Sequence, residues 1–182
     1  MTNYKFTFKK AIKHLNLVNR HRWYVFLACC EAHIPLRGLL HDLSKYSLSE
    51  FINSVKYYTG TQSPIDTEKE LKGYSYAWLH HRGHNRHHWE YWVDNLSSGG
   101  EALKMPLKFT LEMICDWIGA GKAYNKKEWN RATPFDRFNN LYNSGKIKIH
   151  LDTYKFIFQV LYDYKNTQKS LSRIIKLYAF EY

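Results

Sequence analysis

The chain has 182 residues and a formal net charge of +11, from 27 basic and 16 acidic residues. With 45% hydrophobic and 17% aromatic residues, it is too apolar to be a disordered chain. No apolar run approaches the roughly 18 residues of a membrane span, and the first ten residues lack the apolar region of a signal peptide. We therefore expect a soluble, cytoplasmic protein with no membrane partner. The charge favours a phosphate-rich partner, although a lysine-rich composition explains it equally well.

Helical periodicity runs through the chain, and no stretch has the sustained alternation typical of strands. The pattern predicts helices over residues 7–32, 39–43, 66–81, 106–123, 151–164 and 170–180. Another short helix starts near Thr133, and residues 89–96 form one or two turns before a loop at 97–100. Ser47 is the candidate N-cap of one more helix, with Glu50 as its capping-box partner. We expect a single all-α domain over 1–182, a bundle of about seven to nine helices in which 125–182 are C-terminal packing helices.

The three cysteines, Cys29, Cys30 and Cys115, are an odd number with two adjacent members, which makes a poor disulfide framework. They lack the Cys-x-x-Cys spacing of a structural zinc site. Because all three lie in apolar stretches, we expect them to be small core residues in a reducing compartment.

Histidines are concentrated in one segment, where five of the ten lie between residues 80 and 88. Imidazole is the commonest protein ligand for first-row metal ions. The flanking Trp78 and Trp89 distinguish this segment from an expression tag, and a solvated loop is the alternative interpretation. The segment predicts that some of its histidines bind a metal ion.

Two carboxylates lie in apolar surroundings, Asp42 beside His41 and Asp116 within the string LEMICDWIG. A buried charge requires a partner, which is either a metal ion or a salt bridge. His21 lies on the inward face of the first helix, and His14, one heptad earlier, is its rival. Adjacent helical positions point about 100° apart, so His41 and Asp42 can share an ion only in a wedge between helices.

The order His…His-Asp…Asp on separate helices resembles the HD superfamily of metal-dependent phosphohydrolases. The string GLLHDLSK at residues 38–45 is similar to the characteristic helix of that superfamily. More closely, the chain resembles a bacterial and phage branch with strings similar to HDLSK, AWLHH, HHWEYW and DWIGAG, all present between residues 41 and 121. The resemblance covers about residues 15–125. It implies an HD-like helical bundle and an enzyme that hydrolyses a nucleotide or another phosphoester.

The resemblance maps the first metal ion onto four residues, His21, His41, Asp42 and Asp116. It also implies that Asp42 bridges the ions or orients the attacking water. Two-metal members carry extra histidines before the last aspartate, and here His81 and His88 are preferred over the alternates His80 and His87. Only one histidine of each adjacent pair is expected to bind, because adjacent residues on a helix cannot both face the same ion.

The connection between His21 and His41 is 20 residues, shorter than is usual in the superfamily, which keeps His14 as an alternative ligand. Mixed histidine and aspartate ligands suit one or two ions of Mn, Fe, Co, Ni or Zn. No organic cofactor is expected.

Candidate substrate contacts follow from charge and position. Lys45 lies one turn beyond the His-Asp pair and can neutralise a phosphate oxygen, which makes it a candidate catalytic residue with Asp42. Further candidate contacts are Arg82, Asn85, Arg86 and Lys122. Three tryptophans could stack a base or simply belong to the core: Trp78, Trp89 and Trp92.

The expected partner is a phosphorylated small molecule, in the first place a nucleotide, and nucleic acid is a second option. The sequence leaves the oligomeric state open. A non-catalytic nucleotide or nucleic-acid binding module that keeps the same bundle is the alternative function. A purely structural metal protein is a third hypothesis. A metal site with four protein ligands and no open coordination position would favour it.

Overall fold

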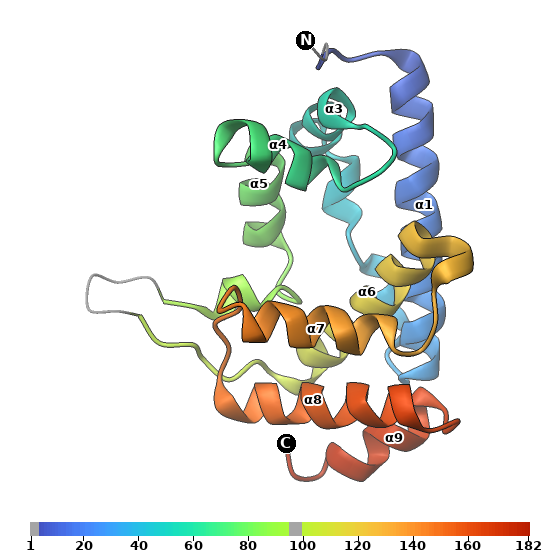
Figure 1. The fold of residues 1–182 in the computed structure, drawn as a ribbon, viewed down its shortest axis with the longest axis vertical. Helices are drawn as coiled ribbons and strands as arrows, with labels where there is room; N and C mark the ends of the chain where they lie inside the picture. Colours follow the sequence, from blue (N-terminus) through green and yellow to red (C-terminus); the bar gives the residue numbers. More distant parts are fainter. Residues whose placement is uncertain (1–3, 95–99) are drawn as a thin grey trace.

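The computed structural model describes residues 4–94 and 100–182, and over these ranges it contains helices and no strand (Figure 1). The α-helices are α1 (Phe8–Glu31), α2 (Pro35–Leu40), α3 (Leu48–Tyr57), α4 (Pro64–Lys72), α5 (Tyr76–His84), α6 (Leu107–Asn125), α7 (Thr133–Asn143), α8 (Leu151–Asn166) and α9 (Leu171–Tyr178). Three short 3₁₀ helices are η1 (Leu43–Tyr46), η2 (Trp89–Trp92) and η3 (Lys126–Glu128). The prediction of an all-α bundle is confirmed. Most of the predicted loop at 97–100 lies outside the described residues.

The long helix α1 runs beside α6, and together they form the most extensive helix pair among the described elements. Thr7 caps α1, because its side-chain oxygen accepts a hydrogen bond from the backbone N–H of Lys10 at 3.2 Å. The helix ends at Glu31, before His33 turns the chain with a φ of 60°. The predicted helix over 7–32 is therefore confirmed. No described helix is both long and apolar enough to cross a lipid bilayer.

Gly119 allows α1 and α6 to approach closely. A Cβ atom at this position would lie 2.5 Å from Cγ2 and 2.8 Å from the backbone nitrogen of Val25 on α1. The substitution Gly119→Ala is therefore expected to lower the free energy of unfolding by about 1–3 kcal/mol through overpacking. Urea denaturation measures this change. Gly83→Ala on α5 is the matched control, because no other part of the described chain comes within 4 Å of the added Cβ. An unfolding midpoint for Gly119→Ala equal to wild type would contradict the close contact.

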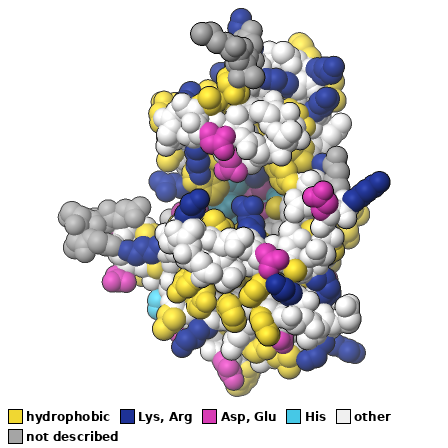
Figure 2. Space-filling model, viewed as in Figure 1, with side chains coloured by type: hydrophobic (Ala, Val, Ile, Leu, Met, Phe, Trp, Pro, Cys, Tyr) yellow, Lys and Arg dark blue, Asp and Glu magenta, His cyan; other side chains and the backbone are white. Residues whose placement is uncertain are grey.

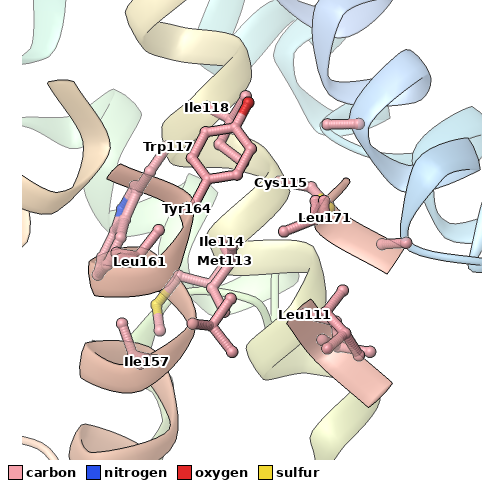
Figure 3. Close-up of a cluster of buried hydrophobic side chains, with 14 of the residues drawn as sticks. Leu111, Met113, Ile114, Cys115, Trp117, Ile118, Ile157, Leu161, Tyr164 and Leu171 are labelled. Carbon is pink, nitrogen blue, oxygen red and sulfur yellow. The ribbon is translucent and has the colours of Figure 1, made fainter. Parts of the chain in front are cut away.

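The hydrophobic core lies where α6 meets α8 and α9. Figure 3 shows Met113, Ile114 and Ile118 of α6 beside Ile157 and Leu161 of α8. This contact fixes one side of α6, while its other side carries part of the candidate site.

Two of the three cysteines are core residues, as expected. Cys29 and Cys115 are buried, but the prediction is wrong for Cys30, which is exposed. Cys30 follows Cys29 on α1, and consecutive helical residues point about 100° apart, so only one of the pair can face α6.

The predicted single helix over 66–81 is two helices in the structure. Gly73 ends α4 in the left-handed conformation, with a φ of 79°. Ser75 then starts α5, because its hydroxyl accepts a hydrogen bond from the backbone N–H of Trp78 at 3.2 Å and donates one to Glu68 at 2.6 Å. The break turns α5 so that its histidines approach the His41-Asp42 segment.

Candidate metal centre

His41 and Asp42 lie in a tight turn between α2 and η1 and not on a helix. The backbone of His41 has φ −54° and ψ 131°, and Asp42 adopts the left-handed conformation with φ 55°. The prediction of a helix over 39–43 is therefore wrong. Since the backbone turns between the two residues, their side chains converge although adjacent helical residues would diverge. Arg22 supports the turn by donating to the carbonyl oxygens of His41 at 2.8 Å and Leu39 at 2.7 Å.

The structure brings together the four residues expected at the first metal ion. Nε2 of His21 lies 3.2 Å from Oδ1 of Asp116, 3.3 Å from Oδ2 of Asp42 and 3.4 Å from Nε2 of His41. Nε2 of His41 lies 3.3 Å from Oδ2 of Asp42 and 3.6 Å from Oδ1 of Asp116. Tetrahedral ligands at about 2.0–2.1 Å from a zinc ion are about 3.3–3.4 Å apart. We call these four residues the first ligand group, and their spacing fits one metal ion.

A second ligand group lies on the other oxygen of Asp42, with members Asp42, His81, His87 and His88. Oδ1 of Asp42 lies 3.3 Å from Nε2 of His81 and 3.4 Å from Nε2 of His87. Three buried atoms of this group have no hydrogen-bond partner among the described residues: Oδ1 of Asp42 and Nε2 of both His87 and His88. Buried polar atoms without a partner are costly, so their convergence points to a cation between them.

The structure shows which histidines of the two adjacent pairs, His80 with His81 and His87 with His88, face Asp42. His81 does so, as we preferred, while Nδ1 of His80 binds Glu50 at 2.7 Å instead. Both His87 and His88 belong to the second ligand group, although we expected only one of them. They follow the end of α5 in non-helical backbone, so the angular separation of helical neighbours does not apply.

Two buried glutamates accept hydrogen bonds from Nδ1 of the ligand histidines. Oε1 of Glu112 accepts hydrogen bonds from Nδ1 of His41 and of His87, both at 3.1 Å, while Oε2 accepts one from Arg37 at 2.5 Å. Glu50 accepts a hydrogen bond from Nδ1 of His81 at 2.8 Å. A bond at Nδ1 leaves Nε2 free to bind a metal ion and fixes the orientation of the ring. Glu112 thereby contacts one histidine from each ligand group.

Sequence reasoning missed both glutamates. Glu112 lies four residues before Asp116 in the same apolar helix, so its helical spacing was an available signal. Glu50 was expected to complete a capping box, which is wrong. Ser47 does cap α3, accepting from the backbone N–H of Glu50 at 3.4 Å, but the Glu50 side chain binds His80 and His81.

The electrostatics of the cluster give most of its groups the protonation state that a metal ligand needs. Despite burial, His41 and Lys45 hold the pKa of Asp42 well below its ordinary value. Burial also opposes ionisation of Glu112, yet hydrogen bonds from the two histidines lower its pKa to about 2. Burial keeps the pKa of His88 well below its usual value, so that ring is neutral. The pKa of His41 is raised despite burial, chiefly by Asp42, so binding of a metal ion at His41 releases a proton.

Lys45 lies beside the cluster on η1. Its Nζ is 2.7 Å from Oδ2 of Asp42 and 3.5 Å from Nε2 of His81, and a quarter of its side chain (25%) is exposed. The expected position one turn beyond the His-Asp pair is thus retained, although the intervening backbone is not an α-helix.

The two ligand groups open into a cavity of about 810 Å³. Figure 2 shows the hollow, with histidine side chains at its base and lysine or arginine side chains at its rim. Residues of α1, α3, α4, α5, α6 and α7 line the cavity, and they include four ligand residues: His21, His81, His88 and Asp116.

The four further residues expected to bind substrate, Arg82, Asn85, Arg86 and Lys122, are not among those that line the cavity. Asn85 donates to Ser44 at 2.8 Å, the guanidinium of Arg86 lies 5.5 Å from the Tyr91 ring centroid, and Lys122 lies over Trp129. Arg82 follows His81 on α5, so the helix turns it away from the cavity.

The basic residues that do line the cavity are Lys45, Lys69, Arg137 and Lys146. Trp78 and Trp89 also line it, whereas Trp92 packs against Phe109 with the ring centroids 5.6 Å apart.

Fold and site together define an all-helical protein with a buried histidine–aspartate cluster that could hold a metal ion. The chain belongs to DUF5662, a family of unknown function whose model matches residues 10–163. This range includes every member of both ligand groups. No curated protein and no solved structure matches the chain.

Proposed function

We propose that this protein is a metal-dependent phosphohydrolase that cleaves a nucleotide or another phosphoester at the cluster around Asp42. The observation that carries the proposal is that the two oxygens of Asp42 face different ligand groups. Oδ2 faces His21 and His41, and Oδ1 faces His81 and His87. Each ligand group would hold one divalent ion, and Asp42 would contribute to both. The residue order and the HDLSK string, which resemble the HD superfamily, support the same activity.

The donor atoms favour one or two ions of Mn, Fe, Co, Ni or Zn, because histidine and carboxylate ligands suit these metals. When bound, such ions activate a water molecule and offset the charge of phosphate oxygens. A closed structural site would keep its ligands away from a substrate. Here ligands from both groups line the cavity, which supports a catalytic role.

The side chains around the cluster have complementary roles. Asp42 has only acceptor atoms when ionised, which suits a carboxylate that would hold the metal ions or accept a hydrogen bond from the attacking water. Lys45 has only donor atoms and directs its charge at a phosphate oxygen. Its ion pair with Asp42, at 2.7 Å, keeps the ammonium group next to the position where that phosphate would lie.

The test is phosphate release from a panel of nucleotides and simple phosphoesters, before and after metal removal by a chelator. We expect release to stop on chelation and to return with one of the five metals. Asp116→Asn should also lose activity, since Asp116 belongs to the first ligand group. Asp152→Asn, at a half-buried aspartate on α8 that belongs to neither ligand group, is the matched control. An inactive but metal-loaded wild type across the whole panel would contradict the enzyme and favour the binding module.

Glu112 gives a separate prediction about metal affinity. Glu112→Gln preserves the size of the side chain but removes the charge that faces His41, His87 and Arg37. Loss of such a supporting carboxylate typically weakens metal binding about 10–100-fold. Competition with a chromogenic chelator measures the affinity, and Glu70→Gln at an exposed position is the control. Wild-type affinity in Glu112→Gln would show that the glutamate supports the fold alone.

A further inference from the structure

The cavity continues from the ligand groups along α1 to His14. His14, Leu17, Val18 and His21 all line it, and their spacing places them on one face of the helix. With a rise of 1.5 Å per residue, His14 lies about 10 Å along the helix from the metal ligand His21. The cavity therefore has a second end, away from the cluster and belonging to neither ligand group.

His14 is buried there without a polar partner. Only 6% of the residue is exposed, and its ring nitrogens make no hydrogen bond among the described residues. Its ring contacts Phe51 and Tyr58, with centroid distances of 5.4 and 5.8 Å. Burial, with a smaller contribution from Lys45, lowers the pKa of His14 to about 4. At neutral pH the ring is uncharged, so one nitrogen donates and the other accepts.

Uncharged polar side chains from α3 and the following loop line the same cavity. Ser54 lies one turn after Glu50, the residue that holds His81, and thus about 6 Å further along α3. Gln62 uses its amide nitrogen to bind Thr67 at 3.0 Å and Glu70 at 2.9 Å, so its side-chain oxygen is left as an acceptor. The ring contact between His14 and Phe51 places the two helices side by side here. We call His14, Ser54 and Gln62 the His14 subsite.

We infer that the His14 subsite binds the organic part of the phosphoester, an uncharged hydrogen-bonding group such as a sugar or a nucleobase, and that His14 determines this specificity. The inference rests on the proposed function and adds the substrate class to it. Sugar hydroxyls and base amides both donate and accept hydrogen bonds, which matches a neutral imidazole and a serine hydroxyl. None of the three subsite side chains carries a positive charge at neutral pH, whereas phosphate groups are usually bound by cationic donors.

The position of the subsite favours an organic part longer than a methyl or ethyl group. Along the helix axes of α1 and α3, the subsite begins about 6–10 Å from residues of the cluster. A nucleoside or a hexose is long enough to extend from a phosphate at the cluster to this end of the cavity.

The test compares wild type with His14→Leu, His14→Gln and, as a control on the same helix, Lys9→Leu at an exposed position. Substrates are the four ribonucleoside 5′-phosphates, glucose 6-phosphate and phenyl phosphate, which has no hydrogen-bonding group at its far end. The kcat/KM of the best substrate relative to phenyl phosphate should fall about tenfold in His14→Leu, the effect of one lost hydrogen bond. His14→Gln, which keeps a donor and an acceptor, should retain most of the ratio.

Binding provides the second readout. Calorimetry gives the dissociation constants of the same compounds for the metal-free protein, which does not turn them over. The constant for the preferred compound should rise about tenfold in His14→Leu and stay near wild type in Lys9→Leu. Equal ratios and equal constants in wild type and His14→Leu would overturn the inference while leaving the proposed function intact. No phosphate release from any compound, with the binding difference present, would overturn the proposed function and support the subsite.

Discussion

Asp42→Ala is expected to reduce the divalent metal content of the purified protein from about two ions per chain to near zero. Both oxygens of this residue face ligand nitrogens, Oδ2 in the first ligand group and Oδ1 in the second. Its removal therefore weakens both groups at once, which no other single ligand substitution does. Elemental analysis of the purified variant measures the loss.

Asp42→Asn separates metal binding from backbone strain. Asp42 has a φ of 55°, and asparagine tolerates this left-handed conformation better than alanine does. The amide keeps one ligand oxygen and replaces the other with a nitrogen that cannot coordinate, so we expect about half of the metal to remain. Full metal content in Asp42→Ala would contradict the assignment of Asp42 as the shared ligand.

Lys45→Ala is expected to lower turnover about a hundredfold and to leave the metal content unchanged. Lysine at neutral pH has no lone pair with which to bind a metal ion, so its contribution is electrostatic. Such groups contribute a few kcal/mol to a transition state, and a hundredfold loss corresponds to about 2.7 kcal/mol. Phosphate release by wild type and variant at matched metal occupancy measures the effect.

The control for this substitution is Lys45→Arg, which keeps the positive charge and should recover part of the activity. A role in folding alone would instead appear as a lower melting temperature in Lys45→Ala. Wild-type turnover in the alanine variant would remove Lys45 from the site.

The first ligand group could be predicted from sequence because its residues combine chemistry with burial. Asp116 stands within an apolar helix, and His21 lies on the inward face of α1. Both need a partner once buried, and the His-Asp pair supplies it. The long helices were predictable for a related reason, because their apolar faces repeat with helical spacing over many residues.

The rest depends on backbone geometry that periodicity does not encode. The left-handed conformation of Asp42 and the non-helical segment that carries His87 and His88 each direct two adjacent side chains to one place. Conversely, Arg82 follows His81 directly in sequence, but their side chains point about 100° apart on the helix, so only His81 lines the cavity. Glu50 contacts His81 across 31 residues of sequence, and no local pattern reveals this contact. Glu112 contacts His41 across 71 residues, and the only local sign of its role is its spacing from Asp116 on α6.

The most direct test of the two-group arrangement is anomalous X-ray diffraction from crystals of the metal-loaded protein, collected at the absorption edge of the metal that restores activity. The two-group arrangement predicts two anomalous peaks on opposite sides of the Asp42 carboxylate. One should lie among His21, His41 and Asp116, and the other among His81, His87 and His88. Peaks that avoid Asp42, or a fully loaded protein with a single peak bound by one group, would contradict it.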